Sequence, residues 1–266
     1  MVGPDAASLD GKVALVTGGA QGIGAAAAMA LASFGADLAI CDRNVDGMRA
    51  TANEVEALGQ RCLTGEMDVR DGDAVERWLD TIGSKLGRVD VLLNNAGGGF
   101  YAAFLDVNAK GQNVLVDENF TSVTHFVRGC VPLMPEGGSI INVTSIEAHR
   151  AAPGFGVYAA MKAAVESLTK TLALELAPKR IRVNAIAPDA IPTPGDEQHA
   201  EAVQSDPAEY GRKVPLGWGD VDDCAGPIVF LASELSRFMT GTILHVDGGS
   251  HAASGWTLRG DGTYAP

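Results

Sequence analysis

Short apolar runs alternate with longer stretches of helical periodicity along most of the chain. The apolar runs are rich in Val, Ile and Leu, which predicts buried strands at residues 12–17, 36–41, 61–67, 89–93, 139–144, 181–186 and 242–246. The stretches between them have the spacing or the alanine content of helices, at residues 25–34, 45–58, 73–86, 119–134, 157–177 and 222–235. Strands that alternate with helices through short connections predict an α/β fold, with a mainly parallel, doubly wound sheet of seven strands flanked by helices.

No linker, repeat or low-complexity tract divides this alternation. We therefore expect a single domain over residues 9–249, with tails at residues 1–8 and 250–266. The chain from residue 188 to 214 is polar and rich in Pro and Gly, which predicts a covering loop with a short helix, and we assign residues 189–219 to this loop. Residues 100–113 and the C-terminal tail show no regular pattern.

Glycines crowd the connection between the first predicted strand and the first predicted helix. Gly18, Gly22 and Gly24 all lie in this connection. The turn could be an ordinary one whose glycines serve packing alone. A strand, a glycine turn and a helix in immediate succession instead favour a site where a pyrophosphate approaches the backbone N–H groups of a helix N-terminus.

An acidic residue, Asp42, follows the second predicted strand, about 20 residues past the glycines. A carboxylate at this point binds the hydroxyls of an adenosine ribose and repels a 2′-phosphate, which favours NAD over NADP. Arg43 instead favours NADP, because a guanidinium can bind that phosphate. Asp42 could alternatively be the N-cap of the helix at residues 45–58. We favour the ribose role.

Tyr158 and Lys162 are four residues apart on a predicted helix, so their side chains leave the same helical face. Ser145 lies at the carboxyl end of the preceding strand, where open α/β sheets bind their ligands. A nearby ammonium group favours the phenolate and lowers the pKa of a tyrosine from about 10, which makes a usable acid or base. The Tyr-x-x-x-Lys spacing alone would indicate only an aromatic anchor beside a solvated lysine.

The net charge of the chain excludes some classes of binding partner. With 20 basic and 33 acidic residues, the formal charge of −13 argues against nucleic acid and anionic membranes, both of which need basic patches. We expect no secretory segment, and no apolar run reaches transmembrane length. The four cysteines are widely spaced without a C-x-x-C pair, which favours reduced thiols in a cytoplasmic protein. We predict no metal site.

Together these residues resemble the classical short-chain dehydrogenase/reductase family over residues 9–249. The matching motifs, in the order and spacing of the family, are Thr17-Gly18-x-x-x-Gly22-Ile23-Gly24, Asp68-Val69, Asn94-Asn95-Ala96-Gly97, Ser145, Tyr158-x-x-x-Lys162 and Asp247-Gly248-Gly249. The resemblance implies a Rossmann fold and reversible hydride transfer between a nicotinamide and an alcohol or carbonyl compound.

The resemblance also implies catalytic roles. Tyr158 would exchange a proton with the substrate oxygen, and Ser145 would hydrogen-bond that oxygen. Lys162 would lower the pKa of the phenol and hold the nicotinamide ribose. A family asparagine anchors a water of the proton relay. Asn108 and Asn119 are the two candidates, and Asn119 matches better because it opens a predicted helix.

By the same resemblance, cofactor contacts are expected from Gly18, Gln21, Gly22, Ile23, Gly24, Asp42, Arg43, Asp68, Val69, Asn95, Ala96, Gly97, Tyr158, Lys162, Pro188, Ile191 and Thr193. The sequence also departs from the family. Glu118 and Trp218 replace an apolar residue and an arginine. Asp189 follows Pro188 where the family has a glycine, and aspartate lacks the freedom of glycine at positive φ. We expect His149 and Arg150 to be solvated loop residues.

The leading hypothesis is an enzyme that uses NAD, or less readily NADP, to oxidise a secondary alcohol or reduce a ketone of apolar or cyclic shape. Candidate pocket residues are Phe100, Tyr101, Ile146, Phe155 and Ile191. The alternative enzyme is a 3-oxoacyl-thioester reductase that uses NADP, and the non-enzyme alternative is a dinucleotide-binding sensor or scaffold. The helices at residues 119–134 and 157–177 resemble those that pair in family oligomers, so we expect a homotetramer.

Overall fold

A computed structural model describes residues 2–134, 137–195, 207–260 and 262–265. Its centre is a parallel sheet with strand order β3-β2-β1-β4-β5-β6-β7. The strands are β1 (Val13–Thr17), β2 (Asp37–Asp42), β3 (Cys62–Glu66), β4 (Val91–Asn94), β5 (Gly138–Val143), β6 (Ile181–Pro188) and β7 (Ile243–Val246). The predicted doubly wound α/β fold is confirmed. Between β1 and β4 the strand order reverses, and open α/β sheets bind their ligands at such a point.

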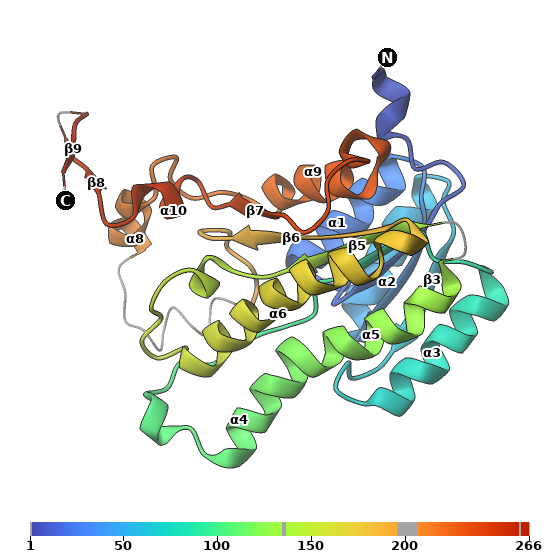
Figure 1. Ribbon diagram of the computed structural model, residues 1–266, viewed down its shortest axis with the longest axis horizontal. Coiled ribbons are helices and arrows are strands. Elements are labelled where there is room, and N and C mark those ends of the chain that lie inside the picture. Colours follow the sequence, from blue (N-terminus) through green and yellow to red (C-terminus); the bar gives the residue numbers. More distant parts are fainter. Residues whose placement is uncertain (1, 135–136, 196–206, 261, 266) are drawn as a thin grey trace.

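Helices cover both faces of this sheet (Figure 1). One face carries α1 (Gly22–Ser33), α2 (Val45–Ala57) and α9 (Val221–Ala232). The other face carries α3 (Gly72–Lys85), α5 (Ser122–Cys130) and α6 (Gly156–Glu175). Successive strand residues point to opposite faces, so on β1 Val16 packs toward the first layer and Leu15 toward the second. Because both faces are buried, the central strand β1 reads as a nearly continuous apolar run.

The helix that carries Asn119 begins earlier than predicted. α4 (Ala109–Val116) is capped by the Asn108 side chain, which accepts a hydrogen bond from Gly111 N. A π-helical turn (Asp117–Thr121) then leads directly into α5, so Asn119 lies inside a long helix and does not open it. The Asn119 amide donates to the carbonyl of Leu115, the acceptor that a regular α-helical N–H would use. This competition accounts for the local widening of the helix.

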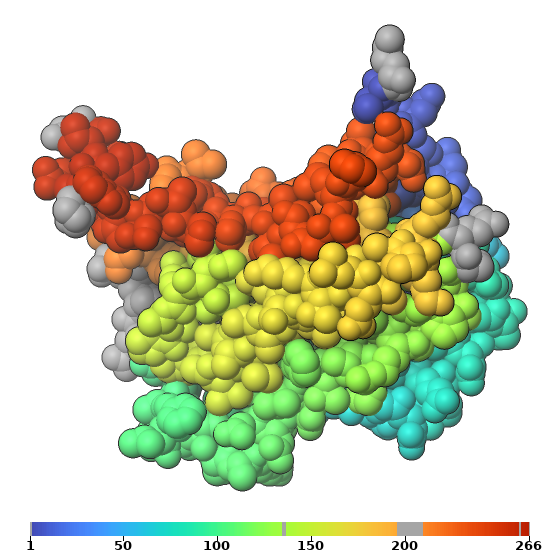
Figure 2. All heavy atoms as spheres, in the orientation of Figure 1, coloured from blue at the N-terminus to red at the C-terminus, as the bar shows by residue number. Residues whose placement is uncertain are grey.

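The chain after β7 is also more ordered than predicted. It forms α10 (Ser250–Ala253) and a small antiparallel pair of β8 (Thr257–Leu258) and β9 (Tyr264–Ala265). Figures 1 and 2 show this segment, here called the C-terminal arm (residues 250–260 and 262–265), standing away from the body of the molecule. The remaining short helix, α8 (Pro207–Lys213), precedes α9. Among the described residues, no helix is long and apolar enough to span a bilayer.

Candidate active site

The glycine turn lies at the point where the strand order reverses. Gly18 and Gly22 have φ values of 68° and 57°, in the left-handed region that favours glycine. A Cβ atom on Gly24 would lie 2.0 Å from the Gly18 carbonyl oxygen, so only glycine lets α1 pack this closely against the end of β1. Gln21 is the N-cap residue of α1, but its side chain makes no capping hydrogen bond. The first N–H groups of α1 therefore suit an anion.

Four hydrogen bonds connect this turn to the residues that follow β4. Thr17 Oγ1 accepts hydrogen bonds from Asn95 N at 3.0 Å and Ala96 N at 2.9 Å. In return, Asn95 Nδ2 donates to the carbonyls of Thr17 at 3.0 Å and Gly18 at 3.1 Å. The structure thus brings three predicted cofactor residues together. Thr17 itself was not predicted as a site residue, since its motif shows the residue but not the bonds that it makes.

Asp42 lies at the end of β2, beside the glycine turn. Its Oδ2 atom accepts from Ala20 N at 3.2 Å and its Oδ1 atom from Asn44 N at 2.9 Å. The N-cap of α2 is Asn44, whose side chain accepts from Gly47 N, so the alternative N-cap role of Asp42 is wrong. Two backbone N–H groups therefore hold the carboxylate in place at the edge of the site.

Arg43 is surrounded by carboxylates. Its guanidinium lies 3.4 Å from Glu118 Oε1 and 3.8 Å from Asp68 Oδ2. Asp68 also accepts hydrogen bonds from Arg70, and this pairing lowers the pKa of Asp68 to about 2. The cation of Arg43 is thus matched by acidic neighbours, and the region around Asp42 carries little positive charge to attract a 2′-phosphate.

Lys162 is buried, with 5% of its surface exposed. It lies one helical turn after Tyr158 on α6, and its Nζ atom is 5.5 Å from the centre of the Tyr158 ring. The ammonium donates to the carbonyl of Val143, at the end of β5, at 3.0 Å. Burial lowers the pKa of Lys162 to about 8, against a smaller opposite effect of Glu118. This lysine is therefore held rigidly and desolvated.

The buried ammonium group of Lys162 should lower the free energy of unfolding of the protein. The unfolded chain holds the Lys162 proton more tightly than the folded chain, so burial of this charge destabilises the fold below pH 8 and ceases to do so as the pH rises from about 8 to 10.5. We expect Lys162→Met to raise the free energy of unfolding at pH 7 by about 1–2 kcal/mol, after the loss of one hydrogen bond. Urea unfolding at pH 7 and pH 10 measures this.

The gain from Lys162→Met should shrink at pH 10, where the parent lysine is neutral. Lys170→Met, on an exposed position of the same helix, is the control and should show no such pH-dependent gain. A Lys162→Met variant that is less stable than the parent at pH 7 would contradict the prediction.

Asn119 and Lys162 meet at Gly97. A Cβ atom on Gly97 would lie 2.9 Å from Asn119 Oδ1 and 3.0 Å from Lys162 Nζ, so this position requires glycine. Asn119 also makes two hydrogen bonds with Gly98, the residue after Gly97. Its side chain donates to the Gly98 carbonyl at 2.8 Å and accepts from the Gly98 N–H at 3.2 Å. The other candidate, Asn108, serves as a helix cap instead. The structure therefore places Asn119 beside the lysine.

Tyr158 lies next to Lys162, and Ser145 lies at the end of β5, two residues past the carbonyl that Lys162 binds. Ser145 is buried two residues past β5, and its Oγ atom accepts from Glu147 N at 3.2 Å. The Tyr158 ring lies against Gly99, where a Cβ atom would come within 3.4 Å of it. The glycines after β4 thus leave room for Tyr158, Lys162 and Asn119 on one side of the crevice.

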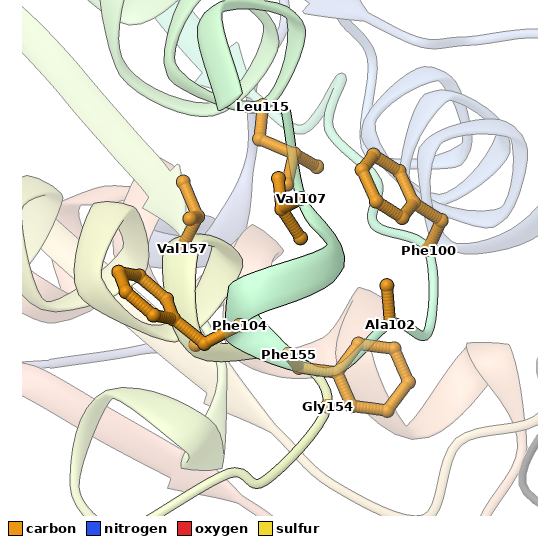
Figure 3. A pocket seen from close by; sticks show the side chains of 9 residues that line it. Phe100, Ala102, Phe104, Val107, Leu115, Gly154, Phe155 and Val157 are labelled. Atoms are coloured by element: carbon orange, nitrogen blue, oxygen red, sulfur yellow. The ribbon is translucent and has the colours of Figure 1, made fainter. Parts of the chain in front are cut away.

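An apolar hollow adjoins the tyrosine. Its lining comes from the segment before α4, from α4 itself, and from the residues around the start of α6. It consists of Phe100, Ala102, Phe104, Val107, Leu115, Gly154, Phe155, Gly156 and Val157 (Figure 3). The rings of Phe155 and Tyr158 are 6.4 Å apart between centroids. Of the predicted pocket residues, Phe100 and Phe155 line the hollow. Tyr101 packs edge-on behind Phe155, whereas Ile146 and Ile191 pack into the core.

The remaining predicted cofactor residues divide between the crevice and the core. Thr193 lies against the glycine turn, since a Cβ atom on Gly22 would be 3.4 Å from Thr193 Cβ. Pro188 ends β6 at the same edge of the sheet. The Val69 side chain is buried in one core layer, and Ile23, which is partly exposed, packs against the other.

Asp189 has a different role from the one that its backbone position suggested. The positive φ value after β6, 54°, belongs to Ala190 and not to Asp189. The Asp189 carboxylate accepts from Tyr210 Oη at 2.5 Å and lies 3.4 Å from Arg150 Nη2. Trp218 stacks on the Tyr210 ring with 5.3 Å between centroids. These contacts fasten α8 to the end of β6, while residues 196–206 of the predicted covering loop lie outside the described residues.

His149 and Arg150 are exposed, as predicted, but both side chains also make contacts that the sequence does not predict. Arg150 donates to Glu147 at 2.8 Å as well as to Tyr210 at 3.1 Å. His149 Nε2 lies 2.9 Å from the buried carboxylate of Glu166 on α6. Both side chains are engaged because the loop after Ser145 packs between α6 and the ends of β6 and β7, a long-range contact that local polarity does not reveal.

Comparison with known proteins identifies the family. A family profile described as enoyl-(acyl carrier protein) reductase matches residues 18–251. The 3-oxoacyl-[acyl-carrier-protein] reductase FabG of Thermotoga maritima is 36% identical over 244 residues, which cover 91% of this chain and 98% of that protein. The chain is a classical short-chain dehydrogenase/reductase. It is accordingly an NAD(P)-dependent oxidoreductase that interconverts alcohols and carbonyl compounds.

Solved structures of other short-chain dehydrogenases/reductases have the same fold. A 7α-hydroxysteroid dehydrogenase complexed with NADH and 7-oxo glycochenodeoxycholic acid matches with a TM-score of 0.88 and 33% identity, over 94% of this chain and 98% of that chain. Carveol dehydrogenase from Mycobacterium avium, in complex with NAD, matches with a TM-score of 0.86 and 32% identity, over 91% and 98% of the two chains.

Proposed function

We propose that this short-chain dehydrogenase/reductase oxidises secondary alcohols, and reduces the matching ketones, with NAD(H) and on apolar, cyclic substrates. The observation that carries the proposal is the grouping of Tyr158, Lys162 and Asn119 around the glycines after β4, beside an apolar hollow. Tyr158 is the only phenol among the four residues predicted to be catalytic, and it adjoins the hollow through Phe155.

The reaction requires one hydride and one proton to move. When bound, the nicotinamide supplies the hydride in reduction or accepts it in oxidation. Tyr158 gives a proton to the carbonyl oxygen in reduction and takes it from the hydroxyl in oxidation. Ser145, held at the end of β5, donates a hydrogen bond to the same oxygen and so fixes its position.

Lys162 serves the tyrosine in two ways. Its charge favours the phenolate over the phenol, and the buried setting strengthens this interaction compared with water. Its bond to the Val143 carbonyl keeps the ammonium in register with the end of β5. One further donor position of the ammonium can reach a ribose hydroxyl. Asn119, whose amide is fixed by Gly98 and Leu115, anchors the water that renews the proton.

We also propose NAD rather than NADP as the cofactor. Asp42 offers a fixed carboxylate to the adenosine ribose, and Arg43 lies between Glu118 and Asp68 instead of being available for a phosphate. The two related structures named above contain NADH and NAD, which supports this choice. Gly18, Gly22 and the start of α1 would hold the pyrophosphate.

Two other functions fit less well. A 3-oxoacyl-thioester reductase is suggested by the name of the Thermotoga maritima relative. Such an enzyme must attract an acidic carrier, whereas this chain carries a formal charge of −13 and Asp42 disfavours NADP. A nucleotide-binding sensor would not need Tyr158, Lys162 and Asn119 to converge.

A substrate panel tests the proposed function. Cyclic and linear secondary alcohols, the matching ketones and a 3-oxoacyl thioester would each be offered with NAD(H) and with NADP(H), and turnover would be read from the nicotinamide absorbance. We expect the highest kcat/KM for a cyclic apolar alcohol or ketone with NAD(H). The highest kcat/KM for the thioester with NADPH would instead establish the alternative.

We further propose that residues 189–219 cover the bound substrate. The contacts of Asp189 with Tyr210 and Arg150 place α8 over the end of β6, next to the loop that follows Ser145. The four cysteines are unpaired and three of them are buried, which supports a reducing, cytoplasmic location.

A homotetramer is the assembly that we propose. Leu174 on the outer face of α6 is 77% exposed, and Trp256 on the C-terminal arm is 50% exposed. Apolar surface of this kind suits contacts between copies of the chain. We expect light scattering at micromolar concentration to give the mass of four chains, and Leu174→Glu to lower it. A monomeric mass for the unmodified protein would contradict the proposal.

A further inference from the structure

Three of the five histidines of this chain come together from distant segments. His149 lies in the loop after Ser145, His245 on β7, and His251 on α10 in the C-terminal arm. One ligand atom from each ring lies within 4.8 Å of the other two. The His245 and His251 rings are stacked at 4.0 Å between centroids, and His149 meets both edge-on at 4.6 Å and 5.0 Å.

One pair of these nitrogens has the spacing that a metal ion requires. His149 Nε2 and His245 Nε2 are 3.2 Å apart. Two imidazole nitrogens bound to tetrahedral Zn²⁺ at about 2.0–2.1 Å are separated by roughly 3.3 Å. A hydrogen bond satisfies only one pair of nitrogens at a time, whereas a cation accepts a lone pair from all three rings.

A buried carboxylate supports the cluster. Glu166 Oε1 lies 2.9 Å from His149 Nε2 and also accepts a hydrogen bond from Thr144 Oγ1 at 3.1 Å. Glu166 thus approaches the same His149 nitrogen that faces His245, so its carboxylate lies beside the position of a cation held by the rings and can balance the charge of that cation. The Glu166 side chain is only 8% exposed, so this negative charge lies in the protein interior. Such a charge has reason to be there when a cation is bound close by.

We propose that His149, His245 and His251 form a binding site for Zn²⁺ or another late first-row divalent cation. Imidazole ligands suit these metals, and three protein ligands leave a fourth position for water. All three residues have exposed surface, so an ion can enter from solvent. The proposal is independent of the proposed oxidoreductase function, because none of the three histidines belongs to the group around Tyr158.

The bound ion would fasten three segments that the chain connects only at long range. His251 belongs to the C-terminal arm and His245 belongs to the edge strand β7. His149 belongs to the loop that follows Ser145. Since the arm otherwise stands away from the body (Figure 2), a metal link at its base would stabilise its attachment. The metal is thus expected to act on stability and not in hydride transfer.

Calorimetric titration of the chelator-treated full-length chain with Zn²⁺ tests this proposal. We expect one Zn²⁺ per chain and a rise of the thermal unfolding midpoint on binding. Glu166→Gln should weaken Zn²⁺ binding by about 10- to 100-fold, because the variant loses the carboxylate charge beside the cation. His251→Asn and His245→Asn, which remove ligands, should weaken it more than that and abolish the rise of the midpoint.

His125→Asn is the matched control. This histidine lies on α5, packs beside Gly72 of α3 and does not belong to the cluster. It should bind Zn²⁺ like the parent chain. Circular dichroism of each variant before titration shows whether it is folded. The proposal would be overturned if the parent chain did not bind Zn²⁺. It would also be overturned if His251→Asn and His245→Asn bound Zn²⁺ with the affinity of the parent chain.

Discussion

Replacing Tyr158 by phenylalanine is expected to lower kcat by about 10²–10⁴-fold, the usual effect of losing a general acid or base. Phenylalanine keeps the ring that packs against Gly99 and Phe155 and removes only the exchangeable proton. The affinity for NADH should stay nearly unchanged, because the glycine turn and Asp42 are untouched. Steady-state kinetics with the best substrate of the panel, together with a fluorescence titration of NADH, measures both quantities.

Two further variants make this result specific. Tyr264→Phe removes a phenol from the exposed C-terminal arm and should leave kcat unchanged. Lys162→Ala should lower kcat and also weaken NADH binding, because the ammonium both favours the phenolate and reaches the ribose. If Tyr158→Phe turns over like the parent, Tyr158 is a packing residue and the proposed mechanism is wrong.

Asp42→Ala is expected to narrow the preference for NAD(H) over NADP(H) by about 5- to 150-fold. This range corresponds to about 1–3 kcal/mol, the size of a clash between a carboxylate and a 2′-phosphate that removal of the charge relieves. Binding titrations of both reduced cofactors to the parent and the variant give the ratio directly.

The control for Asp42 separates charge from hydrogen bonding. Asp42→Asn removes the charge but keeps one acceptor oxygen, so one of the two hydrogen bonds from the N–H groups of Ala20 and Asn44 is retained, whereas Asp42→Ala loses both. It should therefore narrow the preference much as Asp42→Ala does. Tighter binding of NADPH than of NADH to the unmodified protein would show that Asp42 does not select the cofactor.

The strands and most helices could be predicted because parallel strands covered on both faces read as continuous apolar runs. The segment from Val13 to Val16 in β1 is an example, since all of its side chains are apolar and buried. The start of α4 could not be predicted from apolar spacing. It depends on the Asn108 cap, and the π-helical turn after it depends on the bond from Asn119 to Leu115. Such single bonds leave no periodic pattern.

The candidate site shows the same division. Spacing within one helix brings Tyr158 close to Lys162, and the sequence predicts this directly. The contacts of Asp189 with Tyr210, and of His149 with His245, join residues 21 and 96 positions apart. Only the folded sheet determines which loops meet at its carboxyl edge, so the sequence predicts an exposed His149 but not its contacts with Glu166 and His245.

The dependence of alcohol oxidation on pH, measured in single turnovers, tests the central claim most directly. The unmodified enzyme would be mixed with NAD and its best alcohol, and formation of NADH followed by absorbance. We expect the rate to rise with pH through one ionisation well below the value of about 10 for a free phenol, an apparent pKa that belongs to the Tyr158–Lys162 pair. This ionisation should vanish in Tyr158→Phe. The same ionisation and the same rate in both proteins would contradict the assignment of Tyr158 as the group that exchanges the proton.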